Sequence, residues 1–399
     1  MKRILWISMS LPNNLSAGQG TFKYYVESLA NNNSITLIAK AKENEKYNKD
    51  KFVETHIYYP QKGFKRILEI IMSINSKVNP FYKYTNAVMG VYYRYIFSTL
   101  IDLKNKKKDY DVIILEWTQM VLCVNKIKRL FPNAYIIASE HDVTYYGLER
   151  QCAYYSGIRR LISKIRYSTT KKNEIKSLKS CDYIFLHNSD YMSKLTKEGI
   201  AAQKMSGLCP YFHNYSNVNR NVTNNDIIFF GAMNRKENYL SAIWFIENVM
   251  PELDDKFRFV IIGGNPDRSL KKYENSRVII TGFVEDIGRY FENSLCFVSP
   301  LLLGAGIKVK ILEAMSSGIT VLTNDIGIEG INAKNQIDYF HCINPIDYIK
   351  AINILSNNSE LNYQIGSSGK KFIENNFNMH KSLNKYEYIL KNIESLDSK

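Results

Sequence analysis

The chain has 399 residues, which is too long for one ordinary hydrophobic core and predicts two domains. Hydrophobic residues make up 45% of it, which excludes an intrinsically disordered protein. The formal net charge of +15 favours anionic partners such as nucleic acid, acidic lipid or phosphorylated substrates.

The beginning of the chain imitates an export signal, with two basic residues followed by an apolar run at residues 4–9. The run is short and Pro12 follows closely, so we interpret it as the buried first strand of a parallel sheet. No apolar run reaches membrane-spanning length, and the six scattered cysteines have no metal-site spacing. These features predict a cytoplasmic protein with free thiols.

A glycine loop follows the first predicted strand. Gly18, Gln19 and Gly20 open a helix that reaches Asn31, and residues 35–39 form a second strand. Such a β-α-β unit places its glycines where phosphate or sugar binds. The third glycine of a dinucleotide fingerprint is missing and no acidic residue ends the second strand, so NAD binding is disfavoured.

Two segments of the first half combine basic and aromatic side chains. Residues 62–109 contain ten basic residues against three acidic ones, with eight interleaved aromatics. Residues 150–179 contain nine basic residues, opposed by Glu174 alone. Basic amphipathic helices suit the surface of an anionic membrane. For either segment alone, a solvated helical face whose aromatics belong to the core is an equally good interpretation.

Polar side chains follow the next two predicted strands, at residues 112–116 and 135–139. Because ligands of open α/β sheets gather at such strand ends, these side chains are candidate site residues. They are Glu116, Trp117, Thr118 and Gln119 after the first strand and Glu140, His141 and Asp142 after the second. His141 could serve as a hydrogen-bond donor or a base, although a lone histidine is more often structural. The Asp-x-Asp pattern at residues 109–111 precedes its strand, so we predict a turn and no metal.

The strand and helix pattern restarts in the second half of the chain. After a strand at residues 182–187, the polar and asparagine-rich stretch around residues 203–225 is the best candidate linker. A strand at residues 226–230, a loop from Gly231 to Lys236 and a helix then begin a second α/β unit.

Residues 300–330 combine a glycine turn, a short helix ended by Gly318 and another strand. Glycines allow close approach of a ligand to the backbone, and the free amides at a helix start attract anions. Lys308 and Lys310 add positive charge there, and their offset of two residues means that at most one points into a site. Glu313, one turn further, could bind a diol such as ribose. The stretch therefore suits a nucleotide diphosphate, and an ordinary lysine-bearing surface helix is the alternative.

A family resemblance is carried by separated blocks that occur in order between residues 226 and 331. The blocks GAMNRKEN, VIIGGNPD, VIITGFVEDI, GAGIKVKILEAMSSG and NDIGIEG resemble the donor half of glycosyltransferase family 4. The first half is similar more loosely, through its glycine loop and the blocks DVIILEWTQM, SEHDV and HNSD. A branch of the family with a GxGxKxKxLEAM turn is the most similar.

This resemblance implies an α/β protein of the GT-B fold, with two Rossmann-like domains facing across a cleft. We expect an acceptor-side domain at residues 1–205, a linker at 206–225 and a nucleotide-sugar domain at 226–375. A C-terminal helix within residues 376–399 is expected to cross back to the first domain.

The resemblance also implies roles for individual residues. Glu313 is expected to bind the ribose, and His141 is expected to lie against the donor sugar. The diphosphate would face Gly304, Ala305, Gly306 and Ile307, helped by Arg235 or Lys236 beside Gly231 and by Lys308 or Lys310. The backbone of Gly282, Phe283 and Val284 would hold the base. The acceptor side would include Gly18, Gln19, Gly20, Glu116, Trp117 and Gln119. Many relatives have a glutamate where this chain has Ala305, which leaves the donor sugar open.

Together these features predict a bacterial glycosyltransferase at the inner face of the plasma membrane. It would move a sugar from a nucleotide-diphosphate sugar to a lipid-linked or oligosaccharide acceptor of capsule, lipopolysaccharide or exopolysaccharide biosynthesis. His141, Lys310 and Arg235 are the catalytic candidates, no metal or other cofactor is expected, and the resemblance implies retention of configuration. A nucleotide-sugar epimerase of the same fold is the alternative. A nucleic-acid-binding protein would explain the charge, but no recognition motif accompanies it.

Overall fold

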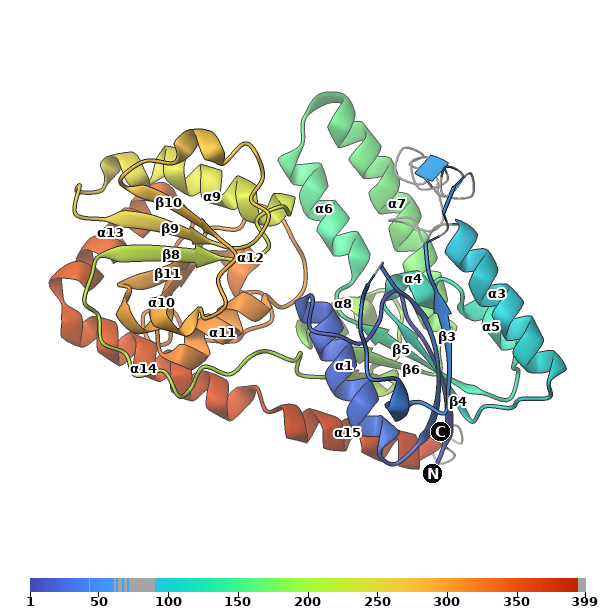
Figure 1. Ribbon diagram of the computed structural model, residues 1–399. Coiled ribbons are helices and arrows are strands. Elements are labelled where there is room, and N and C mark those ends of the chain that lie inside the picture. The colour runs from blue at the N-terminus through green and yellow to red at the C-terminus, as the bar shows by residue number, and fades with distance from the viewer. Residues whose placement is uncertain (43, 61, 64–66, 68–69, 72–89, 394–399) are drawn as a thin grey trace. The chain divides into compact units, whose positions relative to one another are not determined.

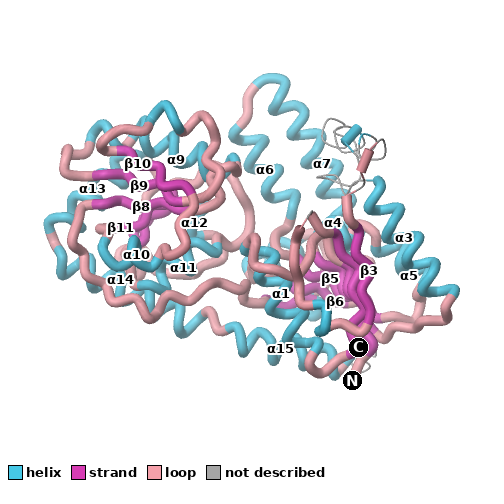
Figure 2. The backbone as a smooth tube through the Cα atoms, viewed as in Figure 1, coloured by secondary structure: helices cyan, strands magenta, loops and turns pink. Residues whose placement is uncertain are grey.

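The computed structural model describes residues 1–42, 44–60, 62–63, 67, 70–71 and 90–393 (Figure 1). The chain divides into two compact units, one comprising Met1–Tyr211 with Met379–Lys399 and the other Phe212–Asn378. Each unit is built around a parallel sheet flanked by helices, as Figure 2 shows for the magenta strands and cyan helices.

The first unit contains a seven-stranded sheet with the order β3-β2-β1-β4-β5-β6-β7, parallel throughout. Its strands are β1 (Arg3–Ile7), β2 (Ser34–Lys40), β3 (Glu54–Tyr58), β4 (Val112–Glu116), β5 (Tyr135–Glu140), β6 (Tyr183–Leu186) and β7 (Met205–Gly207). Its helices are α1 (Ala17–Ala30), α3 (Gly90–Asn105), α4 (Thr118–Val121), α5 (Val124–Leu130), α6 (Thr144–Tyr154), α7 (Gly157–Lys179), α8 (Asp190–Lys197) and α15 (Met379–Lys391), with short 3-10 helices at Lys49–Lys51 and Ala202–Lys204.

Alternate side chains of the first strand enter two separate cores. Leu5 and Ile7 pack with α3, α5 and α8 on one face of the sheet. Ile4 and Trp6 pack with α1 and α15 on the other face. Because both faces are covered, the strands read as continuous apolar runs rather than alternating ones. The ring of Tyr386 in α15 is fully buried and lies 4.1 Å from the Phe185 ring centroid, so the last helix belongs to this first unit.

The second unit contains a six-stranded parallel sheet with the order β10-β9-β8-β11-β12-β13. Its strands are β8 (Asp226–Phe230), β9 (Arg258–Ile262), β10 (Val278–Gly282), β11 (Cys296–Ser299), β12 (Val321–Thr323) and β13 (Phe340–His341). Its helices are α9 (Lys236–Asn248), α10 (Gly288–Asn293), α11 (Val309–Ser317), α12 (Asp325–Ile328), α13 (Pro345–Asn357) and α14 (Ser359–Asn376), with 3-10 helices at Met250–Glu252 and Lys271–Tyr273.

The two sheets share one topology. In each sheet the strand order reverses between the strand that comes first in the unit's sequence and the strand that comes fourth, which lies beside it. These are β1 and β4 in the first unit and β8 and β11 in the second. Loops that leave two such strands in opposite directions open a crevice at the carboxyl edge of the sheet, where ligands of α/β proteins bind. The topology therefore locates one candidate site in each unit.

The predicted linker at residues 206–225 contains the boundary between the two units, at Tyr211 and Phe212, and its residues 208–225 belong to no helix or strand. Residues Met205–Gly207 pair with β6 as an edge strand, so the first sheet extends into it. Beyond the unit boundary, the guanidinium of Arg220 donates hydrogen bonds to the carbonyls of Phe291, Glu292 and Ser294. The linker is thus tied to the second unit by a side chain whose backbone acceptors lie far along the chain.

The first basic segment is only partly described. Lys65, Arg66, Lys77, Lys83, Phe64, Phe81, Tyr82 and Tyr84 lie outside the described residues. In α3, Tyr92 is fully buried and Tyr93, Tyr95 and Phe97 pack against the core. The aromatics that can be placed therefore serve the core. Within the described part of the chain, no helix is both long and apolar enough to cross a membrane.

Candidate active site

The candidate site of the second unit lies where β8 and β11 end side by side. The Gly231 loop connects β8 to α9, and residues 300–308 connect β11 to α11. Gly304 and Gly306 have φ values of 121° and 73°, in the region that favours glycine. Lys308 precedes α11 without a side-chain cap, so the first amides of the helix are left to attract an anion.

Lys310 is held beside the Gly231 loop by contacts with α9 and β8. Its Nζ donates a hydrogen bond of 2.6 Å to Asn238 Oδ1 and lies 4.4 Å from the Phe229 ring centroid. Asn238 Nδ2 in turn donates to the Ala232 carbonyl at 2.9 Å. Burial, together with Arg235 and Lys308 nearby, lowers the pKa of Lys310 to about 7. Because burial and the neighbouring cations disfavour the charged form of Lys310, an anion bound beside it would stabilise that charge.

The other predicted cations have different surroundings. Lys308 Nζ donates to the Gly306 carbonyl and lies 3.6 Å from Glu329 Oε2, so a carboxylate already balances its charge. Arg235 forms an ion pair with Glu237 while its side chain stays 62% exposed. Of the two lysines, Lys310 is therefore the one directed to the Gly231 loop. Lys236, at the start of α9, is exposed.

Glu313 lies one turn into α11 and is partly buried. Its Oε1 accepts the His213 amide at 3.3 Å, a long hydrogen bond. Burial raises the pKa of Glu313 to about 7. A carboxylate with one weak partner retains acceptor capacity for a vicinal diol, which donates two hydrogen bonds at once.

The predicted base-binding backbone lies at the end of β10. Gly282 has a φ of 70°, and its carbonyl accepts the amide of Gly263 at the end of β9. The turn leaves the ring of Phe283 77% exposed beside Gly264, and Val284 is partly buried. An exposed aromatic ring beside two glycine turns offers a stacking surface.

The candidate site of the first unit is organised by Glu116 at the end of β4. This carboxyl group is 1% exposed, with Oε2 accepting Trp6 Nε1 at 2.9 Å and Oε1 accepting Ser139 Oγ at 3.0 Å. His141 Nε2 lies 2.5 Å from the same Oε1. Burial raises the pKa of Glu116 to about 7 and lowers the pKa of His141 to about 3. Glu116 was expected on the acceptor side, but in the structure it forms a hydrogen bond with His141 and so fixes the orientation of that ring.

Two aromatic rings hold His141 in place. The Trp117 ring stacks on it at 4.8 Å between centroids, and the His187 ring lies 4.5 Å from it. Trp117 has a φ of 68° and a ψ of 150°, which is costly for a residue other than glycine. On the ring edge opposite Glu116, Nδ1 faces Gly18, where an added Cβ would lie 3.6 Å away. Glycine at that position thus leaves access to Nδ1.

The remaining acceptor-side candidates are Gln19, Gly20 and Gln119, and they differ in how far their surroundings already occupy them. Gln19 is 7% exposed. Its Oε1 accepts a hydrogen bond from Ser16 Oγ and its Nε2 donates one to the Leu11 carbonyl, so this side chain stabilises the loop. Gly20 packs against the Tyr211 ring, where an added Cβ would lie 3.3 Å from Cδ1. Gln119 is partly exposed.

Glu116, His141 and His187 also bring potential metal ligands within 4.8 Å of one another. The 2.5 Å separation of Glu116 and His141 is that of a hydrogen bond and leaves no room for an ion between the two atoms. Both Glu116 oxygens are already bonded, as described above. Glu116 and His141 therefore form a hydrogen-bonded pair, whereas neither ring nitrogen of His187 has a hydrogen-bond partner among the described residues.

Three contributing residues were not predicted. Asn238 positions Lys310, His187 packs against His141, and Trp6 anchors Glu116. An indole inside a buried strand needs an acceptor for its N–H, which was a usable signal for Trp6. Asn238 and His187 become recognisable only when distant parts of the chain are brought together.

Comparisons with known proteins agree with this architecture. Residues 224–358 match the family described as "Glycosyl transferases group 1". The "Uncharacterized 44.6 kDa protein in cps region" of Klebsiella pneumoniae is 23% identical over 301 residues, covering 71% of this chain and 75% of the relative.

Solved structures resemble the whole chain at low identity. Sucrose-phosphate synthase of Thermosynechococcus elongatus has a TM-score of 0.71 and 12% identity, covering 99% of this chain and 100% of its own. Anabaena HepE in complex with UDP-glucose has a TM-score of 0.68 and 10% identity, covering 98% and 100%. WaaG, a glycosyltransferase involved in lipopolysaccharide biosynthesis, has a TM-score of 0.67 and 12% identity, covering 96% and 98%. The chain thus has the fold of GT-B glycosyltransferases, and residues 224–358 of its second unit match the glycosyl transferases group 1 family.

Proposed function

We propose that the protein transfers a sugar from a nucleotide-diphosphate sugar to an acceptor. The observation that carries this proposal is Lys310, held by Asn238 beside the uncapped start of α11 within a glycosyl transferases group 1 domain. HepE, which shares the fold, binds UDP-glucose, which supports a donor of this class.

The chemistry of the site fits departure of a nucleoside diphosphate. Negative charge accumulates on the diphosphate as the bond to the anomeric carbon breaks. The ammonium group of Lys310 and the first amides of α11 stabilise that charge more strongly as it develops, which lowers the barrier. Glu313 would hold the ribose, and His141 would contact the sugar. Transfer is proposed to need no metal and to retain the anomeric configuration.

The acceptor is proposed to be a lipid-linked glycan of a bacterial surface polysaccharide. The relative from a cps region supports a capsule precursor, and the fold shared with WaaG supports a lipopolysaccharide-type acceptor. Such an acceptor implies action at the inner face of the plasma membrane, with the protein bound peripherally.

A screen of UDP- and GDP-sugars for release of free nucleotide tests the reaction, with and without EDTA. We expect release with at least one donor, stimulated by a lipid-linked acceptor and unchanged by EDTA, because cationic side chains neutralise the leaving group. Epimerised nucleotide sugar formed without acceptor would instead identify an epimerase. Activity lost with EDTA and restored by Mn²⁺ would contradict the metal-independent mechanism.

Glu116→Gln is expected to lower kcat by about 10- to 100-fold, because the carboxylate that orients His141 is lost. With Glu116 ionised above a pKa of about 7, His141 Nε2–H donates to it and leaves Nδ1 as an acceptor. At saturating donor, where the bound diphosphate keeps Lys310 protonated, the wild-type kcat should therefore rise through pH 7, and the variant should lack this rise. Ser139→Ala, which removes one bond to the same oxygen, is the matched control and should keep the rise. An unaltered pH profile in Glu116→Gln would contradict the assignment.

A further inference from the structure

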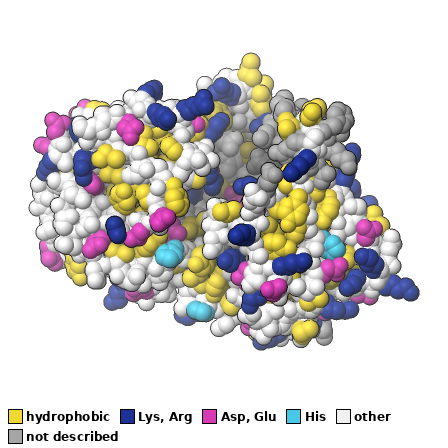
Figure 3. Space-filling view, viewed as in Figure 1, with side chains coloured by type: hydrophobic (Ala, Val, Ile, Leu, Met, Phe, Trp, Pro, Cys, Tyr) yellow, Lys and Arg dark blue, Asp and Glu magenta, His cyan; other side chains and the backbone are white. Residues whose placement is uncertain are grey.

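The outward face of α7 has a composition that is unusual for a solvated helix. At spacings of three and four residues it presents apolar and basic side chains in one stripe. Ile158 is 77% exposed and Leu161 is 60% exposed at the start of the helix. At the turn between α6 and α7, hydrophobic and basic side chains lie together on the surface (Figure 3). The stripe comprises Ile158, Leu161, Lys164, Ile165, Ser168, Lys172, Ile175, Lys176 and Lys179.

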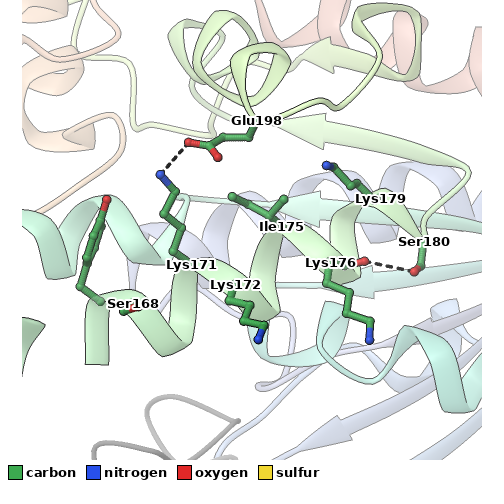
Figure 4. A pocket seen from close by; sticks show the side chains of 9 residues that line it. Ser168, Lys171, Lys172, Ile175, Lys176, Lys179, Ser180 and Glu198 are labelled. Carbon is green, nitrogen blue, oxygen red and sulfur yellow. Dashed lines mark hydrogen bonds and ion pairs between the residues drawn. The ribbon is translucent and has the colours of Figure 1, made fainter. Parts of the chain in front are cut away.

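An open groove of about 780 Å³ runs along the second half of this face. Its lining is Tyr167, Ser168, Lys171, Lys172, Ile175, Lys176, Lys179, Ser180 and Glu198. Glu198 is the one acidic residue of that lining, and Lys171 already neutralises it at 2.7 Å. Lys172 and Lys176 point in the same direction from the helix (Figure 4). Neither of them, nor Lys179, forms an ion pair with any residue that the structure describes.

The stripe is carried by a firmly anchored helix. On the opposite face of α7, the fully buried Glu174 accepts the amides of Thr144 and Tyr145 at 2.8 and 3.1 Å, which caps the start of α6. Thr118 Oγ1 donates to the same carboxyl group at 3.1 Å. The inner face of α7 thus belongs to the core, and Ile175 at the edge of the stripe also packs against that core, whereas Ile158, Leu161, Lys172 and Lys176 are exposed.

We propose that the outer face of α7 docks on an anionic phospholipid bilayer, with Ile158 and Leu161 inserted and the lysine groove binding headgroup phosphates. Apolar side chains beside lysines match the boundary between acyl chains and headgroups, whereas a purely charged face would match solvent. The stretch 64–89 is a poor alternative occupant, because its sequence is itself basic. The inference rests on the proposed function, in which the acceptor is lipid-linked, and assigns the membrane contact to one helix.

Co-sedimentation of the full-length protein with vesicles tests the proposal, using neutral phosphatidylcholine and a mixture with 30% phosphatidylglycerol. Wild type should bind the anionic vesicles and not the neutral ones. Lys172→Gln with Lys176→Gln should weaken that binding about 25-fold, since each lysine near an anionic surface contributes about five-fold. Ile158→Ser with Leu161→Ser should weaken it at least about ten-fold.

Matched pairs on the second unit serve as controls. Lys350→Gln with Lys371→Gln and Ile346→Ser with Ile354→Ser change exposed residues of the same types and should bind as wild type does. UDP or GDP affinity measured by calorimetry should be unchanged in every variant, so a defect in vesicle binding is distinguishable from failure of the donor site. Stripe variants that sediment like wild type would overturn the proposal. Absence of vesicle binding together with lysine-dependent binding of RNA would also overturn it.

Discussion

Lys310→Met is expected to lower kcat for sugar transfer by about 10²- to 10³-fold. The methionine keeps most of the side-chain volume while it removes the charge that faces the departing diphosphate. Because that charge acts mainly as the bond breaks, kcat should fall much more than the affinity for the donor. Steady-state kinetics with the donor identified by screening measure both quantities.

Lys308→Met is the matched control for this experiment. Lys308 lies two residues earlier, but its Nζ is 3.6 Å from Glu329 Oε2 and is bonded to the Gly306 carbonyl. The charge of Lys308 is therefore already balanced by Glu329, and Lys308→Met should lower kcat clearly less than Lys310→Met does. Equal losses in the two variants would contradict the assignment of Lys310 as the residue that contacts the diphosphate.

The pH dependence of nucleotide binding provides a second readout. The pKa of Lys310 is lowered to about 7, so the free protein loses this positive charge as the pH rises above 7. The affinity for a nucleoside diphosphate should therefore decline above pH 7, and binding there should be accompanied by proton uptake. In Lys310→Met the decline should disappear.

The sequence was sufficient to predict those parts of the fold that depend on local pattern. Buried parallel strands form apolar runs, so β4 was predicted with its observed bounds of Val112–Glu116. A glycine that can adopt a left-handed conformation ends α11, and Gly318 has a φ of 81° there. The Rossmann-like order of strands and helices followed from these two kinds of signal.

What escaped prediction depends on contacts between distant residues. Composition marked residues 206–225 as a linker, but it could not reveal that Arg220 binds carbonyls 71 and 72 residues away. Spacing predicted that at most one of Lys308 and Lys310 would face a site, but the choice of Lys310 requires Asn238, 72 residues earlier. Glu116 ended its strand as a candidate contact for the acceptor, and only its enclosure by Trp6, Ser139 and His141 reveals a supporting role.

Glu313→Ala is expected to weaken binding of UDP or GDP by about 10²-fold, as measured by calorimetry. Two ribose hydroxyls that donate to one carboxylate contribute about 1.5 kcal/mol or more each, and alanine removes both hydrogen bonds. The variant also loses the hydrogen bond from the His213 amide, so its thermal stability must be compared with that of wild type. Glu313→Gln keeps the shape and should fall between the two.

A double-mutant cycle with 2′-deoxynucleotides separates contact with the ribose from a general disturbance of α11. Removing the 2′-hydroxyl should weaken binding to wild type, but it should make little further difference in Glu313→Ala, because the partner is already gone. If the deoxynucleotide loses as much affinity in the variant as in wild type, Glu313 does not hold the ribose.

The protonation of Glu313 gives an independent check. The pKa of Glu313 is raised to about 7 by burial, so its contribution to binding should grow as the pH rises through 7. That trend is opposite in sign to the contribution of Lys310, and wild-type affinity should therefore be greatest near neutral pH.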